Sequence, residues 1–277
     1  LLILGYYSVV AGWTLEYTWQ ALSNGFSGVD AGGYTQFFED FSQNPWRPLF
    51  WMIVFMVMTH VVIVMGVKKG IEKSAKIMMP MLFILILVLV ACSVTLPNAE
   101  AGIKFLLEPD FSKVTPGVFL GAMGQAFFSL SLGLGCLSTY ASYFGKDTNL
   151  SKTAFSVAGI VTLVAILAGF IIFPAAFSVG VSPDAGPSLL FITLPNVFQM
   201  AFGNVPLLAY IFSVMFYILL ALAAFTSTIS MHEVVTAFVH EDCKLPREKA
   251  AVYVTIACTL LGVLSALSFG VLSEFRI

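Results

Sequence analysis

GQAFFSLSLGLG, residues 124–135, is the stretch of sequence that decides the fold, because it places serines and glycines inside a long apolar segment. That segment runs from residue 116 to about residue 144 and, as one continuous helix, would be roughly 43 Å long at 1.5 Å per residue. The hydrocarbon core of a membrane requires only about 30 Å. Part of the segment can therefore unwind, and unwound backbone at membrane depth must find its partners in protein or in a water-filled cavity. Breaks of this kind are where membrane transporters place substrate and ion sites.

The composition excludes an ordinary soluble domain. Hydrophobic residues make up 59% of the chain, charged residues only 10%, and the mean hydropathy is +0.95. Stretches such as residues 79–91 are apolar all round rather than on one face, as expected of helices surrounded by lipid. The sequence predicts an all-α, polytopic membrane protein with seven transmembrane helices, at residues 1–22, 46–67, 77–96, 116–144, 153–180, 206–239 and 249–272.

Charge alternates along the predicted loops. The intervening loops are mainly acidic, whereas every second loop is basic and carries Lys68, Lys69, Lys73 and Lys76, then Lys146 and Lys152, then Lys244, Arg247 and Lys249. By the positive-inside rule, the basic loops are cytoplasmic. The net charge of −2 indicates nothing about a nucleic-acid partner, and without a strongly basic face or tail the sequence predicts none.

The four cysteines predict neither a disulfide nor a structural metal. Cys92, Cys136 and Cys258 fall within predicted spans, and Cys243 falls in a predicted cytoplasmic loop. The sequence has no Cys-x-x-Cys pair and no cluster of cysteine with histidine.

The interrupted segment carries groups that suit a binding site. Ser129 and Ser131 offer hydroxyls, while Gly133 and Gly135 permit backbone conformations that a side chain would forbid. Unwound carbonyls can coordinate Na⁺, and the amide ends of the half-helices can face an anionic group. The alternative is a face of small residues where two membrane helices pack closely.

A second motif, AAFTSTIS at residues 223–230, lies in the sixth predicted span. Na⁺ is a hard cation and prefers oxygen ligands, which Thr226, Ser227 and the carbonyl of Ala223 can supply within one helical turn. The alternative is that these hydroxyls only donate to carbonyls of the preceding turn, as is common in membrane helices.

The segment around residues 188–200 is amphipathic rather than spanning. It fits short helices that dip toward the membrane as a lid, or an interfacial loop with no gating role.

Five motifs in order give the chain a family resemblance. They are Tyr6-Tyr7 followed by GWTL at residues 12–15, KGIEK at 69–73, the stretch 124–135 with TYASY at 139–143, FITLP at 191–195, and Thr226-Ser227. With these motifs the chain resembles a neurotransmitter:sodium symporter, a secondary transporter with the leucine-transporter fold.

The resemblance implies a fold and a function. The seven spans would correspond to the third through ninth helices of that inverted-repeat bundle, so residues 1–277 would form one partial transmembrane transporter domain. The chain also opens inside an apolar span without a Met, which agrees with a fragment. The implied activity is sodium-coupled symport of an amino acid or related amine by alternating access, in the plasma (inner) membrane and without enzymatic chemistry. We expect that the 277 residues alone neither transport nor bind substrate tightly, because the missing first helix supplies about half of the family's ligands.

The family's site residues can be assigned to matching positions in this sequence. Tyr7 resembles the tyrosine that meets the substrate carboxylate, and Ala223, Thr226 and Ser227 match a sodium site. Ser129 matches a residue of the second sodium site or of a chloride site, to which Gln125 would also belong. Parts of the cytoplasmic gate would be Tyr143 and Glu241, and the other positions that resemble the substrate pocket are Ile3, Phe128, Ser129, Ser131, Leu134 and Met231.

Two positions depart from the family pattern. Val161 stands where the family usually places Asn or Asp as a sodium ligand, which argues against a complete second sodium site. Leu134 stands where a large aromatic residue is common, which would enlarge the pocket.

Ionisable residues within the predicted spans are costly in hydrocarbon and are therefore functional candidates. They are His60, His232 and Glu233. For Glu233 the resemblance suggests a structural partner within the bundle, with a proton-carrying role as the alternative, and for His60 we expect a satisfied polar residue near the cytoplasmic side. An intramembrane enzyme would need a nucleophile or a metal constellation on facing helices, and the sequence shows none. A non-transporting sensor on the same scaffold is the remaining alternative, and Val161 would agree with it.

Overall fold

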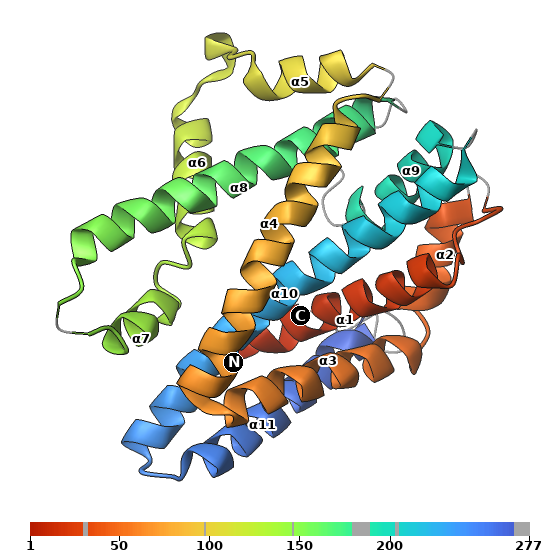
Figure 1. Ribbon diagram of the computed structural model, residues 1–277. Helices are drawn as coiled ribbons and strands as arrows, with labels where there is room; N and C mark the ends of the chain where they lie inside the picture. The colour runs from red at the N-terminus through yellow and green to blue at the C-terminus, as the bar shows by residue number, and fades with distance from the viewer. Residues whose placement is uncertain (30–32, 97, 146, 179–188, 203–204, 269–277) are drawn as a thin grey trace.

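The computed structural model describes residues 1–29, 33–96, 98–145, 147–178, 189–202 and 205–268, and every regular element in this part of the chain is helical (Figure 1). The prediction of an all-α chain is therefore confirmed there. The elements are α1 (Leu2–Leu22), α2 (Gly33–Ser42), α3 (Arg47–Val64), the π-helix η1 (Val67–Glu72), α4 (Lys73–Ser93), α5 (Ala99–Leu107), the 3₁₀-helix η2 (Phe111–Lys113), α6 (Pro116–Ser129), α7 (Cys136–Ser142), α8 (Leu150–Ser178), the π-helix η3 (Leu189–Thr193), α9 (Leu194–Phe202), α10 (Pro206–Asp242) and α11 (Arg247–Ser268).

Five helices in the described ranges are long and apolar enough to cross a membrane: α3, the segment Lys69–Ser93, α8, α10 and α11. Two of the seven predicted spans are not among them. The span predicted at 1–22 coincides with α1, which has the length but carries several polar side chains, and the span predicted at 116–144 is divided between α6 and α7. The ends predicted at residues 180 and 272 lie outside the described residues.

Helix α1 lies at the centre of a tightly packed group. Its most extensive contacts are with α10, α3 and α11. A Cβ added at Gly12 of α1 would lie 2.6 Å from the backbone nitrogen of Met52 in α3, and one added at Gly262 of α11 would lie 2.5 Å from the sulfur of Met52. Helices α1 and α3 therefore approach so closely that a methyl group has no room between their backbones, as small residues allow in membrane bundles, whereas at Gly262 the neighbour is the flexible side chain of Met52.

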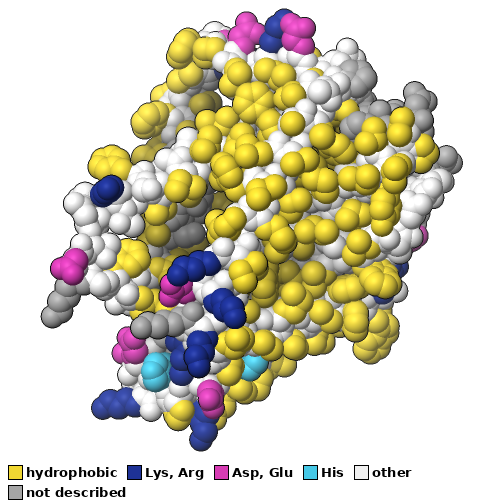
Figure 2. Space-filling view, in the orientation of Figure 1, with side chains coloured by type: hydrophobic (Ala, Val, Ile, Leu, Met, Phe, Trp, Pro, Cys, Tyr) yellow, Lys and Arg dark blue, Asp and Glu magenta, His cyan; other side chains and the backbone are white. Residues whose placement is uncertain are grey.

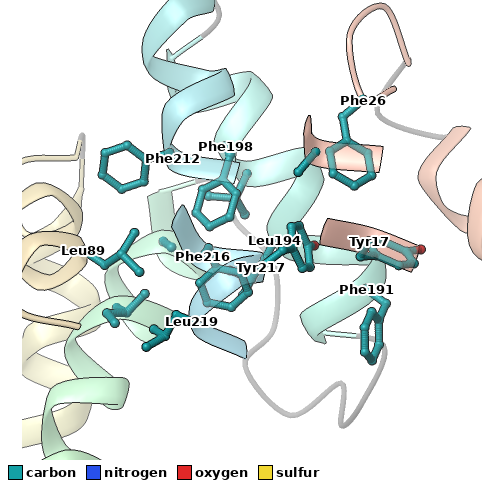
Figure 3. Packing of buried hydrophobic residues seen from close by; sticks show 14 of the residues in the cluster. Tyr17, Phe26, Leu89, Phe191, Leu194, Phe198, Phe212, Phe216, Tyr217 and Leu219 are labelled. Carbon is teal, nitrogen blue, oxygen red and sulfur yellow. The ribbon is translucent and has the colours of Figure 1, made fainter. Parts of the chain in front are cut away.

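An aromatic core closes one end of this group. Tyr17 of α1 is completely buried, and its ring centroid lies 5.0 Å from that of Phe191 and 5.3 Å from that of Tyr217 (Figure 3). Phe191, Leu194 and Phe198 bring η3 and α9 into the same core. The segment predicted as a lid or an interfacial loop is thus part of the hydrophobic core where it is described.

The surface has the polarity expected of a membrane protein. Figure 2 shows charged side chains gathered at two opposite ends of the visible face and hydrophobic side chains between them. At the end that carries α5, Lys104 lies 2.7 Å from Glu100, and this hydrogen bond holds the pKa of the Glu100 carboxyl below its usual value. The buried carboxylate of Glu16 in α1 accepts hydrogen bonds from Arg47 and Trp51 at the start of α3, so this buried acid is paired.

Candidate substrate and sodium site

The backbone between α6 and α7 is not helical. Helix α6 ends at Ser129, and the six residues before α7 include three with positive φ: Ser131 at 54°, Gly133 at 80° and Gly135 at 80°. Glycine adopts this conformation without the steric cost that a side chain brings. Among the described residues, the amides of 133–135 have no backbone hydrogen-bond partner, so their donors are free to meet a ligand.

A cavity of about 280 Å³ lies beside this break. It is bounded by α1, by α6 and the break, and by α10. All seven residues expected to contact substrate line this cavity, namely Ile3, Tyr7, Phe128, Ser129, Ser131, Leu134 and Met231. Gln125 and Ser227, which were assigned to ion sites, line it as well. Two further lining residues, Cys136 and Ser230, were not predicted from the sequence.

The two missed residues had a sequence signal. Ser230 lies one turn after Thr226 in the second motif, and Cys136 directly follows the last glycine of the break. Ser230 accepts a hydrogen bond from the Tyr140 hydroxyl at 3.0 Å. Its position in the cavity therefore depends on α7 as well as on α10.

Tyr7 and Ser227 come from different helices and line the same cavity. Tyr7 lies on α1 and Ser227 on α10, and their side chains are close enough to interact. Because Ser227 also belongs to the predicted sodium motif, a group bound by Tyr7 would lie next to that motif.

The sodium motif also faces a second cavity, of about 360 Å³, between α4, α8 and α10. Ala223, Thr226 and Ser227 line it, and the Thr226 hydroxyl donates to the Ala223 carbonyl at 2.9 Å. In this structure the Thr226 hydroxyl therefore donates to a carbonyl of the preceding turn, as the alternative interpretation of the motif expects. The Thr226 hydroxyl oxygen and the Ala223 carbonyl oxygen are also close enough together for one cation to contact both. The described residues supply oxygen atoms suited to a hard cation and no cluster of three carboxylate, histidine or cysteine groups, so they fit part of a sodium site.

Val161 lines the same second cavity from α8. Its isopropyl group offers no oxygen, and most of the surrounding side chains are apolar. The position therefore adds no ligand for a cation. On the first cavity, the Gln125 amide donates to the Ser129 hydroxyl at 3.3 Å, a pair whose N–H and O–H donors could also face an anion.

The two predicted gate residues lie in different surroundings. Tyr143, the residue directly after α7, donates to Oε1 of Glu233 at 2.6 Å, and Arg247 donates to Oε2 of the same carboxylate at 2.6 Å. Glu233 is completely buried, so the structural partner expected for it is Arg247 with Tyr143. Glu241 lies two turns further along α10, where it is exposed.

These features define a class of protein: an all-helical, multi-pass membrane chain with the leucine-transporter fold. The solved structure of MhsT in complex with L-phenylalanine shares this fold with a TM-score of 0.89 and 45% sequence identity, over 100% of this chain and 62% of that one. The chain belongs to the sodium:neurotransmitter symporter family, whose model matches residues 38–273. Members of this family are transporters rather than enzymes.

Relatives of the chain are named as sodium-dependent transporters. An uncharacterized sodium-dependent transporter of Bacillus subtilis (strain 168) is 40% identical over 277 residues, which is all of this chain and 60% of that protein. The sodium-dependent serotonin transporter of Drosophila melanogaster is 27% identical over 285 residues, covering 93% of this chain and 44% of that protein. This chain therefore spans about three fifths of the length of the Bacillus relative.

Proposed function

We propose that this chain is the central part of a sodium-coupled symporter for an amino acid or related amine. In this proposal residues 1–277 contribute seven crossings of one transporter domain, the third to ninth of the family fold, with the fourth crossing divided into α6 and α7. The observation that carries the proposal is that Tyr7, Ser131 and Ser227, from three separate segments, line one cavity of about 280 Å³. The family membership and the sodium dependence named for the relatives support the same activity.

The cavity suits a small molecule with a polar end and an apolar end. The Tyr7 hydroxyl and the free amides of 133–135 would bind a carboxylate, since hydrogen bonds to a charged acceptor are the stronger ones. Phe128, Leu134 and Met231 would contact an apolar side chain. MhsT was solved with L-phenylalanine, a ligand of this kind.

Sodium would bind beside this molecule. Ala223, Thr226 and Ser227 would hold it through one carbonyl and two hydroxyl oxygens, and the Thr226 proton would turn away from the Ala223 carbonyl when the ion binds. Bound sodium would supply positive charge near the substrate carboxylate. Ser129 would take part in a second sodium site or, together with Gln125, in a chloride site, and the absence of an oxygen ligand at Val161 argues against a complete second sodium site.

Alternating access would act through the cytoplasmic contacts of α7. Tyr143, with Glu241 further along α10, would form part of the cytoplasmic gate. The surrounding partner would be the lipid bilayer of the plasma (inner) membrane, as the apolar face between two charged ends supports (Figure 2).

The test uses the full-length transporter reconstituted in vesicles, with uptake of labelled apolar amino acids measured against sodium concentration. The double variant Thr226→Ala with Ser227→Ala should lose sodium-stimulated uptake by at least tenfold. Thr228→Val is the matched control, because the Thr228 hydroxyl is buried, donates to the Ala224 carbonyl at 2.8 Å and lines neither cavity. A double variant with the full sodium response of the parent would refute the ion site, and absence of uptake by the parent for every amino acid would refute the transport proposal.

A further inference from the structure

The packing of α1 against α10 defines two ends of the substrate cavity. Thr18 of α1 donates to the Tyr217 carbonyl of α10 at 3.1 Å. Tyr7 lies earlier on α1 and is close to Ser227, which lies later on α10. The two helices are therefore antiparallel. Continuing in the same direction, Ile3 of α1 lies at the level of the α10 residues that follow Ser227.

One end of the cavity is polar, and the other is mostly aliphatic on these two helices. Tyr7 and Ser227 mark the polar end, where the proposed function places the substrate carboxylate. At the other end α1 contributes Ile3, and α10 contributes Ser230 and Met231. Met231 also packs against the cluster that contains the neighbour of Ile3, which agrees with this level. Ser230 therefore brings a hydroxyl oxygen to the end of the cavity where the substrate side chain would lie.

The Ser230 hydroxyl makes two hydrogen bonds within the protein. Its Oγ accepts from the Tyr140 hydroxyl at 3.0 Å and donates to the Thr226 carbonyl at 3.0 Å. The described residues offer the Tyr140 proton no other acceptor, so Tyr140 is the donor of the pair. A serine hydroxyl has one proton and two acceptor lone pairs. In this arrangement the oxygen can still accept one hydrogen bond, whereas its proton is already used.

Tyr140 holds this oxygen in place from outside the cavity. Its ring packs against the cluster that contains Ile229 of α10, and it lines two other hollows but not the substrate cavity. Ser230 is thus fixed between α7 and α10 before any ligand arrives. An acceptor that is already in position loses little conformational freedom when it meets a ligand.

The position of Ser230 determines the length of the side chain that it can meet. Ser230 follows Ser227 by three residues, which is about 4.5 Å of rise along the helix. A substrate with its carboxylate near Tyr7 and Ser227 reaches this level with the end of a long side chain, and a hydroxyl on its β-carbon falls short. The matching class is an amino acid with an apolar body and an O–H or N–H donor at its tip, such as a phenol or an indole.

We propose that Ser230 is a specificity-determining residue that accepts a hydrogen bond from the tip of the substrate side chain. The cavity then favours aromatic amino acids that carry a terminal donor over purely apolar analogues of the same shape. This subsite rests on the proposed function, from which it takes the position of the carboxylate. The gain is roughly three- to tenfold in affinity, because a neutral hydrogen bond in the cavity replaces one made to water.

Competition between two compounds of nearly equal shape tests the subsite. Tyrosine carries a donor at its tip, whereas the fluorine of 4-fluorophenylalanine cannot donate. Each competes with the sodium-dependent uptake of labelled phenylalanine by the full-length transporter in vesicles, and the readout is the ratio of their half-inhibitory concentrations. The parent should favour tyrosine, and Ser230→Ala should reduce this preference roughly three- to tenfold. An equal ratio in the parent and in Ser230→Ala would overturn the proposal.

Two further variants separate the oxygen from its surroundings. Tyr140→Phe removes the same contact between α7 and α10 but keeps the Ser230 oxygen, so the preference for tyrosine should persist. Cys136→Ala removes the thiol that also lines the cavity, and the preference should persist again. Loss of the preference in Tyr140→Phe would assign the effect to a loosened α7, and loss in Cys136→Ala would assign it to the thiol. Either result would contradict the role of Ser230.

Binding distinguishes a failure of the subsite from a failure of the proposed function. Calorimetry on the full-length protein in nanodiscs with sodium gives the dissociation constants of both compounds. If the parent binds them but shows no uptake, transport fails, while the ratio of dissociation constants in the parent and in Ser230→Ala still decides the subsite. A parent that binds neither compound overturns the subsite. Uptake of phenylalanine with an unchanged ratio in Ser230→Ala overturns the subsite alone and leaves the proposed function standing.

Discussion

The Tyr143 hydroxyl donates to the carboxylate of Glu233 at 2.6 Å, and this bond ties the end of the short helix α7 to the last third of α10. A second contact of the same kind lies one turn away, where the Tyr140 hydroxyl donates to Ser230 at 3.0 Å. Tyr140 and Tyr143 are three residues apart in the chain, and so are their partners Ser230 and Glu233. Residues at this spacing lie on one side of a helix, so the two hydrogen bonds join facing sides of α7 and α10. Together they hold the half-helix that follows the break against a helix that also carries the sodium motif.

Removing the Tyr143 hydroxyl should loosen α7. We expect Tyr143→Phe to lower the free energy of unfolding by about 1–3 kcal/mol, because a hydrogen bond to a buried carboxylate is lost. Denaturation in detergent measures the change. Tyr253→Phe is the control, since that side chain is 58% exposed on α11; equal stability losses in the two variants would contradict the role given to Tyr143.

The ion pair between Glu233 and Arg247 should show strong coupling. Glu233→Gln leaves the guanidinium without its charged partner, which we expect to cost about 3–5 kcal/mol. Arg247→Met leaves the buried carboxylate unpaired and should cost a similar amount. The double variant should be more stable than the sum of the two changes predicts, and strict additivity in this double-mutant cycle would show that the pair is not coupled.

The glycine before α7 should not tolerate a side chain. Gly135 has a φ of 80°, and an added Cβ would lie 3.1 Å from Cγ1 of Val234. We expect Gly135→Ala to destabilise the protein by about 1–2 kcal/mol, the cost of a left-handed conformation. Gly121→Ala in α6, where an added Cβ meets nothing within 4 Å, should leave stability unchanged or raise it by up to about 1 kcal/mol.

The size of residue 134 should set the preference among apolar substrates. Leu134→Phe fills part of the cavity and should reduce uptake of aromatic relative to small apolar amino acids by about tenfold or more. Leu132→Phe is the control, because Leu132 lines a different hollow, next to α8. Competition assays with the full-length transporter measure the ratio, and an unchanged preference in Leu134→Phe would place the substrate elsewhere.

An oxygen at residue 161 should strengthen sodium binding. Val161→Asn adds an amide carbonyl to the cavity that the sodium motif faces, and we expect the sodium concentration for half-maximal uptake to fall roughly fivefold, equivalent to about 1 kcal/mol. Val157→Asn, one turn away on α8 and outside that cavity, should have no such effect. A sodium dependence that stays the same in Val161→Asn would mean that residue 161 does not approach the ion.

Local chemistry indicated the position of one helix end, whereas a single membrane crossing interrupted by glycine stays a prediction. Serines and glycines within an apolar segment indicate where a helix ends, and the structure ends α6 at Ser129. The seven expected pocket residues could be named because the motif order resembles a family, and they line one cavity. The roles of these residues in binding stay predictions.

Pairings between distant helices could not be predicted from the sequence. Arg47 and Glu16 are 31 residues apart, and Thr255 and His60 are 195 apart, so their contacts depend on how the helices pack. The positive-inside rule placed Arg247 in a cytoplasmic loop, although its guanidinium reaches back to Glu233. The amphipathic 188–200 segment was expected to form short helices of a lid or an interfacial loop, but the pattern could not show that Phe191 and Phe198 enter the aromatic core.

The close packing of helices at the glycines of α1 has a practical consequence for distance measurements made during transport. Helices α1, α3 and α11 cannot slide past one another without opening a gap, because the α3 backbone at Met52 fills the space beside Gly12 of α1 and the Leu261 Cβ of α11 fills the space beside Gly5 of α1. They therefore supply a fixed reference frame. Two spectroscopic labels, one on α3 and one on α11, should keep a constant distance during transport, which calibrates the measurement. The distance from a label on α7 to either of these labels should change in each transport cycle and so report the movement of α7.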